Sequence, residues 1–103
     1  MPGRMATISV LLTLHLPAAQ SLKDKRAIVR SLVERLRSRR QLSAAEVGLQ
    51  DRVQQAQIGF AVVSGDLATA RQVATETQRF VDRELLGRAE VISAEVEEAV
   101  LQS

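Results

Sequence analysis

Positively charged side chains are concentrated in one short stretch, residues 21–40, which reads SLKDKRAIVRSLVERLRSRR. The stretch holds eight of the chain's 14 lysines and arginines and only two carboxylates, so it carries +6, while the remaining residues sum to −4. Arginine pairs with phosphate through two parallel hydrogen bonds, and a dense positive patch attracts polyanions. The stretch therefore predicts binding of a phosphate backbone and no reaction. The candidate nucleic-acid-binding residues are Lys23, Lys25, Arg26, Arg30, Arg37, Arg39 and Arg40.

The spacing of these cations fits the surface of a helix. Lys23, Arg30 and Arg37 recur every seven residues and fall along one line of a helix, with Arg26 beside them. A solvated helix face that only keeps the protein soluble gives the same pattern. Cations in the last helical turn are also stabilised by the helix dipole, by about 0.3–1 kcal/mol each, without any ligand. The sequence leaves the functional and the structural interpretation open.

Residue types that carry catalysis or hold metals are missing or isolated. The chain has no cysteine, which excludes disulfides, thiolate metal sites and cysteine nucleophiles. It has no asparagine, the residue that positions water in acylphosphatase-type catalysis, and its single histidine, His15, has no second histidine to complete a metal site. Nucleotide-binding and nucleophile-elbow glycine motifs do not occur either. We therefore expect no catalytic residue, no metal and no cofactor.

The elements that position the cations follow from hydrophobic periodicity. Apolar residues alternate in four segments, as in half-buried strands, and recur at helical spacing in two others. The expected strands are residues 6–16, 46–50, 57–64 and 90–97, and the expected helices are residues 21–39 and the segment between Asp66 and Gly87. In the short second strand, Val47 and Leu49 are expected to point inward. Ser21, with Asp24 three residues later, is expected to cap the first helix.

This order of elements, βαββαβ, predicts an α+β protein with a ferredoxin-like plait. Two βαβ units with right-handed crossovers give a four-stranded antiparallel sheet, of strand order 4-1-3-2, with two helices on one face. We expect residues 6–103 to form one such domain and residues 1–5 to be a flexible N-terminal leader, in which Met5 is an alternative start. Polar residues interrupt the apolar positions of the first strand, which argues against a signal peptide, so a cytoplasmic protein is expected.

The open face of the predicted sheet indicates which kinds of partner the protein can bind. RNA-binding proteins of similar architecture stack bases on aromatic residues of this face. The chain has only two aromatic residues, and the alternation places Phe60 on the helix side, so base stacking on the sheet is not expected. Leu11, Ala61 and Val63 are the candidate interface residues of a homodimer formed through the open face. An exposed sheet face without a partner is the alternative.

The run Ser21-Leu22-Lys23-Asp24-Lys25-Arg26 resembles the S-L-K-x-K-R signature of the YlxP-like family of small bacterial proteins. The likeness continues through Ala45-Glu46-Val47, Gln50-Asp51, Ala56, Gly59 and Ala61-Val62-Val63-Ser64. The resemblance implies a ferredoxin-like fold and a loose association with translation and ribosome maturation, and it supplies no catalytic residues.

The sequence thus leads to two expectations of function. The first is a non-catalytic protein that associates with RNA or the ribosome by binding phosphate through its first helix. The alternative is a protein-interaction or regulatory module that dimerises through its open sheet face.

Overall fold

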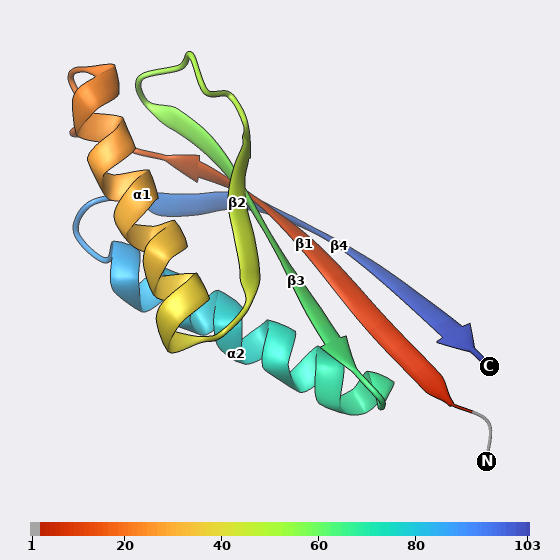
Figure 1. Ribbon diagram of the computed structural model, residues 1–103. Helices are drawn as coiled ribbons and strands as arrows, with labels where there is room; N and C mark the ends of the chain where they lie inside the picture. Colours follow the sequence, from red (N-terminus) through yellow and green to blue (C-terminus); the bar gives the residue numbers. More distant parts are fainter. Residues whose placement is uncertain (1–2) are drawn as a thin grey trace.

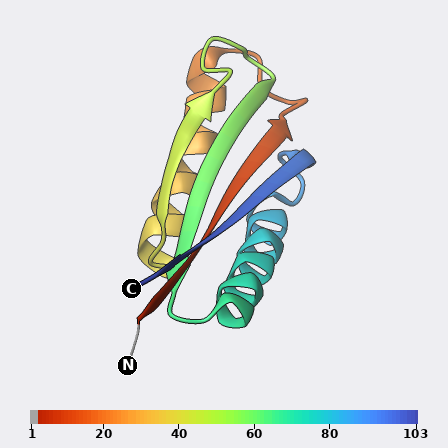
Figure 2. The ribbon, with the colours of Figure 1, turned by 90° about the vertical axis from the view of Figure 1, so that its right-hand side faces the viewer.

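Two helices pack on one face of an antiparallel sheet in the computed structural model, which describes residues 3–103 (Figures 1 and 2). The strand order is β2-β3-β1-β4, or β4-β1-β3-β2 when the sheet is read from its other edge. The central strands are therefore β1 and β3, which carry the most apolar sequences. The elements are β1 (Arg4–His15), α1 (Leu22–Arg39), β2 (Ser43–Gly48), β3 (Gln55–Ser64), α2 (Leu67–Leu85) and β4 (Glu90–Gln102).

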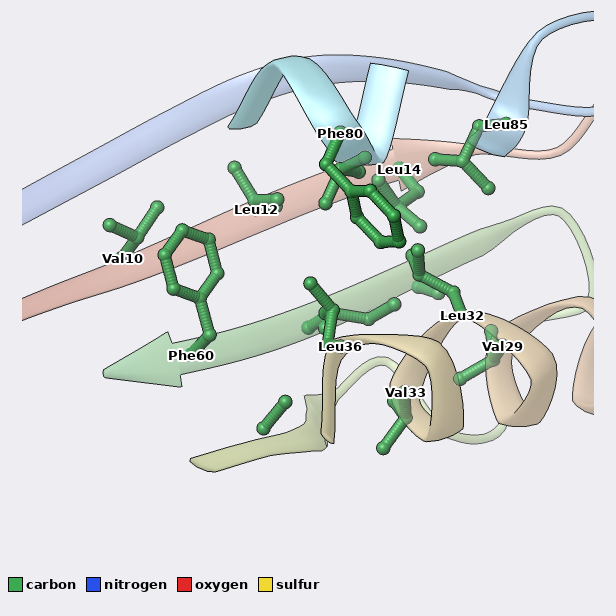
Figure 3. Close-up of a cluster of buried hydrophobic side chains, with 14 of the residues drawn as sticks. Val10, Leu12, Leu14, Val29, Leu32, Val33, Leu36, Phe60, Phe80 and Leu85 are labelled. Atoms are coloured by element: carbon green, nitrogen blue, oxygen red, sulfur yellow. The ribbon is translucent and has the colours of Figure 1, made fainter. Parts of the chain in front are cut away.

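The core lies between the helices and the helix-facing side of β1 and β3 (Figure 3). Alternate residues of the two strands point to this side, and the antiparallel register places Val10 opposite Phe60 and Leu12 opposite Ile58. The helices contribute apolar stripes at intervals of three and four residues. Phe60 is buried, as the alternation predicted. The helix residues buried in the core are Val29, Leu32, Val33, Leu36, Ala70, Ala74, Phe80, Val81 and Leu85.

Both helices begin at side-chain caps. Ser21 Oγ accepts a hydrogen bond from the Asp24 backbone N–H at 3.0 Å, and Asp24 Oδ2 accepts one from the Gln20 N–H at 3.0 Å. The first bond confirms the capping role expected of Ser21, and Asp24 accepts from the residue before the cap rather than from Ser21 itself. Asp66 Oδ2 accepts hydrogen bonds from the side chain and the backbone of Thr69, which lower the pKa of the Asp66 carboxyl below its ordinary value.

The prediction for the second strand is wrong in both position and direction. β2 spans Ser43–Gly48 rather than residues 46–50. Val47 is 55% exposed and lies beside Gly59, while Ala44 is buried under the helices. Leu49 has a φ of 56° and has already left the strand. The prediction rested on the alternate apolar residues Val47 and Leu49. In the structure, Ala44 is the only apolar side chain of β2 that reaches the core. Because alanine is small, this position gives only a weak signal in the sequence.

The first strand begins at Arg4, two residues before its predicted start at residue 6. Arg4 and Met5 belong to β1 and pair with Gln102 and Leu101 of β4, and the Gly3 N–H donates to Ser103 Oγ at 2.9 Å. Residues 1 and 2 of the predicted leader lie outside the described residues. β4 accordingly runs to Gln102 rather than residue 97, with a shift of its register against β1 between Thr13 and Leu14.

Candidate nucleic-acid interface

Four cations on the outer side of α1 are exposed and make no ion pair with residues 3–103. Arg37 makes one internal contact, in which its Nε donates to the Ala44 carbonyl of β2 at 2.9 Å. This bond fixes the base of the guanidinium group and leaves its two terminal nitrogens without a protein partner in the described chain. The four side chains are Lys23, Arg26, Arg30 and Arg37.

Three of these arginines line a shallow hollow between α1 and the edge strand β2. The hollow has a volume of about 440 Å³ and an apolar floor formed by valines of α1. Glu34 and Glu46 also line it, so its charge is mixed rather than uniformly positive. Because these two carboxylates repel anions, we expect an anion to approach the arginines from the solvent. The residues lining the hollow are Arg26, Val29, Arg30, Val33, Glu34, Arg37 and Glu46.

Lys25 does not belong to this surface, and its prediction as a phosphate-binding residue is wrong. Its side chain is 0% exposed. The ammonium group donates to the carbonyls of Leu49 and Gln50, at 2.6 and 3.2 Å, and lies 3.4 Å from Glu46 Oε2. Lys25 thus ties α1 to β2 and to the loop that follows it. A buried charge is tolerated only with such partners.

A positional signal for the burial of Lys25 was present in the sequence. Lys25 precedes Val29 by four residues and Leu32 by seven, so it continues the apolar stripe of α1. Lys23 lies two residues away, about 200° around the helix, and is exposed.

The cations at the end of α1 contact carboxylates of α2. Arg35 forms an ion pair with Glu84, Arg39 Nη1 lies 3.5 Å from the same carboxylate, and Arg40 Nη2 lies 3.8 Å from Glu76. The Arg40 guanidinium also sits 5.9 Å from the centre of the Phe80 ring. Arg39 and Arg40, expected to bind phosphate, are therefore partly neutralised within the protein.

The three predicted interface residues lie on the open face of the sheet, which Figure 2 shows in front of the helices. Val63 is 64% exposed, and Leu11 and Ala61 are half-buried. Leu11 and Ala61 line a shallow hollow of about 580 Å³ at the centre of this face, whereas Val63 lies outside it. Both aromatic residues are buried, so no ring is available for base stacking on the described open face.

His15 lies at the end of β1, where its Nδ1 is 3.4 Å from Glu90 Oε1. Residues 3–103 contain no group of three histidine, cysteine, aspartate or glutamate side chains that could hold a metal ion. Neither α1 nor α2 is long and apolar enough to span a bilayer.

The architecture defines the class of protein as ferredoxin-like α+β, and solved structures support this class. A de novo designed protein with a ferredoxin fold, LFR1 1, superposes with a TM-score of 0.54 at 13% identity, covering 91% of this chain and 83% of the design. MupZ from Pseudomonas fluorescens gives 0.52 at 15% identity, covering 87% and 69%. The YXEP protein of Bacillus subtilis, a dinuclear metal binding peptidase, gives 0.54 at 11% identity, covering 94% of this chain and 26% of that one.

Residues 7–96 match the family described as "Protein of unknown function (DUF503)", and the chain belongs to this family. The comparison with curated proteins gave no match. Because the structural neighbours are less than 25% identical to this chain, they establish the fold alone.

Proposed function

We propose that this protein binds the phosphate backbone of structured RNA through the four free cations of α1 and acts in the cytoplasm in translation or ribosome maturation. The resemblance to YlxP-like proteins supports the association with translation. Lys23, Arg26, Arg30 and Arg37 are the binding residues of the proposal. No reaction is assigned.

The observation that carries the proposal is that the cations of α1 fall into two groups, one paired within the protein and one exposed without an ion pair in the described residues. Arg35, Arg39 and Arg40 contact carboxylates of α2, whereas Arg26 and Arg30 protrude without a carboxylate partner in the described residues. An arginine whose only role is to stabilise the fold is expected to contact another part of the protein. Exposed arginines beside a hollow are suited to an external anion.

The proposed binding has weak sequence preference. Phosphate contacts position a protein on nucleic acid and carry no direct sequence information. Neither Phe60 nor Phe80 is accessible for stacking on an unpaired base. We therefore expect the protein to recognise the shape and charge of folded RNA.

Filter binding with a structured RNA at two salt concentrations tests the proposal. Four phosphate contacts predict a loss of affinity of about 50–150-fold between about 50 and 200 mM salt. The double variant Arg26→Glu/Arg30→Glu should abolish binding at the lower salt. The control variant Arg79→Glu/Arg83→Glu changes the net charge equally at exposed positions of α2 and should retain most of the binding. Equal losses in the two variants would show that only the overall charge matters.

A second candidate function is homodimerisation through the open face. The shallow hollow lined by Leu11, Gly59 and Ala61 favours it, because a complementary surface of another copy can cover small apolar residues closely. Sedimentation at micromolar concentration tests it: a dimer that Leu11→Arg converts to monomers supports this function. A monomer that Leu11→Arg leaves unchanged counts against it.

A further inference from the structure

β4 forms one edge of the sheet and is exposed along almost its whole length. Of its 13 residues only Val91 is half-buried, and the other 12 are exposed. Half of the exposed large apolar side chains among residues 3–103 lie on this strand, with exposed fractions between 42% and 66%. These side chains are Ile92, Val96, Val100 and Leu101.

An exposed edge of this length is a template for another strand. Its outward backbone N–H and C=O groups have no partner in the sheet, and proteins usually guard such edges with charged side chains, above all lysine, with proline or with a short strand. The sequence of β4, EVISAEVEEAVLQ, contains neither lysine nor proline. The opposite edge differs, because β2 has only six residues and its Ala44 carbonyl already accepts a hydrogen bond from Arg37.

The charges of β4 indicate the chemistry of a partner. Glu95 and Glu97 lie opposite Leu11 and Ser9 and therefore point to the open face, where they have no ion-pair partner in the described part of the chain. Glu98 points to the helix side, and Arg71 of α2 binds it through two hydrogen bonds, of 2.7 and 2.8 Å. Two carboxylates thus remain free on one side of the strand, while Val96 is exposed on the other side.

A second copy of the chain is a poor partner for the middle of this edge, around Val96. Antiparallel self-pairing centred on Val96 would place Glu95 of one copy opposite Glu97 of the other. Centring the pairing one residue earlier or later would oppose two copies of Glu95 or two copies of Glu97. Like charges directly opposite each other in a sheet are destabilising.

We propose that β4 binds an extended basic segment of a partner protein, which adds a fifth strand to the sheet. Backbone hydrogen bonds to the free edge supply the affinity, and the alternation of side chains supplies the selectivity. Lysine or arginine at alternate positions of the segment pairs with Glu95 and Glu97, and apolar residues between them cover Val96 and Val100. This surface lies at the opposite edge of the sheet from β2 and α1, so it extends the proposed RNA binding without depending on it.

Fluorescence anisotropy with a labelled peptide that alternates lysine and valine tests this proposal on the full chain. A peptide that alternates glutamate and valine measures charge selectivity. A lysine–valine peptide that is N-methylated at every residue measures strand pairing, because methylation removes the backbone donors from both of its edges. The expected result is that only the unmodified lysine–valine peptide binds and that amide hydrogen exchange slows within residues 94–100.

The variant Glu95→Gln/Glu97→Gln should weaken peptide binding roughly three- to tenfold, since each cross-strand charge pair contributes modestly. The matched variant Glu34→Gln/Asp51→Asn removes two exposed carboxylates elsewhere and should leave the affinity unchanged. The proposal is overturned by absent binding, by equal binding of the methylated or the glutamate peptide, or by equal affinities in the two variants. A dimer with exchange protection at β4 would also overturn it and identify a second copy as the occupant.

Discussion

Two lysines of the same motif have opposite structural roles. Lys23 is exposed on the outer side of α1, whereas Lys25 is buried against Glu46 and two carbonyls of the segment after β2. A buried ion pair contributes little net stability when it is intact, but removal of one partner leaves the other without compensation. Lys25 is thus a structural residue within a motif whose other two cations, Lys23 and Arg26, are exposed.

Substitution of Lys25 by methionine should lower the free energy of unfolding by about 3 kcal/mol, because both carbonyls lose their donor and Glu46 loses its ion-pair partner. The same change at Lys23 should alter stability by less than about 0.5 kcal/mol, as is usual at exposed positions. Urea denaturation of the two variants measures both values. Similar stabilities would contradict the buried role of Lys25.

The Arg71–Glu98 pair links stability to pH. The hydrogen bonds from Arg71 lower the pKa of the Glu98 carboxyl below its ordinary value, and Glu98 in turn raises the pKa of Arg71. A lowered carboxyl pKa contributes stability above the ordinary value of 4.5, and this contribution is lost as the pH falls through the folded-state pKa. In Arg71→Gln, an NMR titration should therefore find a higher pKa for Glu98. An unchanged pKa would show that Arg71 does not hold the carboxylate in solution.

At the scale of elements, α1 has three functions that its sequence interleaves. Its apolar stripe packs on the sheet, its Lys25 and Arg37 bind backbone carbonyls at and beyond β2, and its outer arginines face solvent. The bonds to β2 place the arginines beside the sheet edge, where residues of α1 and Glu46 of β2 line the same hollow. The geometry of the proposed RNA site therefore depends on the N-cap of α1 and on the hydrogen bonds that attach α1 to β2 and the loop after it.

The N-cap of α1 should be measurable in the intact protein. Ser21→Ala removes the acceptor of the Asp24 N–H and should lower the free energy of unfolding by about 1 kcal/mol. Ser38→Ala, at an exposed position inside the last turn of the same helix, should change it by less than about 0.5 kcal/mol. Thermal or urea denaturation separates the two, and an equal effect would argue against the cap.

At the scale of the whole molecule, the two edges of the sheet differ in charge. The free arginines of α1 lie along the β2 edge, and Glu95 and Glu97 lie on β4 at the opposite edge. A polyanion is therefore attracted to one side and repelled from the other. This polarity limits the number of phosphates that one molecule contacts.

The salt dependence of RNA binding should reflect that limit. Four free cations predict a slope of about −3 for the logarithm of the binding constant against the logarithm of salt concentration. Arg30→Gln should make the slope shallower by about one, whereas Arg35→Gln, which removes a cation paired with Glu84, should change it much less. Filter-binding titrations at several salt concentrations measure these slopes. A wild-type slope of about −5 to −6 would mean that the paired cations Arg35, Arg39 and Arg40 also bind phosphate.

Hydrophobic periodicity was sufficient to predict the order and type of the elements. Each of β1 and β3 has one face in the core, which gives an alternating pattern, and both helices carry apolar stripes at helical spacing. It was not sufficient to predict where the two edge strands begin and end. β2 contributes only Ala44 to the core, and nearly all of β4 is exposed, so burial imposes little pattern on either sequence. The same reason explains why the ends of β4 and β1, which pair with each other beyond the helices, were missed.

The sequence by itself determined that the positive charge of this protein gathers on one helix and that both aromatic rings are unavailable to a ligand on the open sheet face. Only the tertiary structure decided which cations remain free. The partners of Lys25, Arg35 and Arg40 come from β2, the loop after it and α2, segments that lie far away along the chain. Folding brings their carboxylates and carbonyls to the helix, and helical spacing alone carries no information about those contacts.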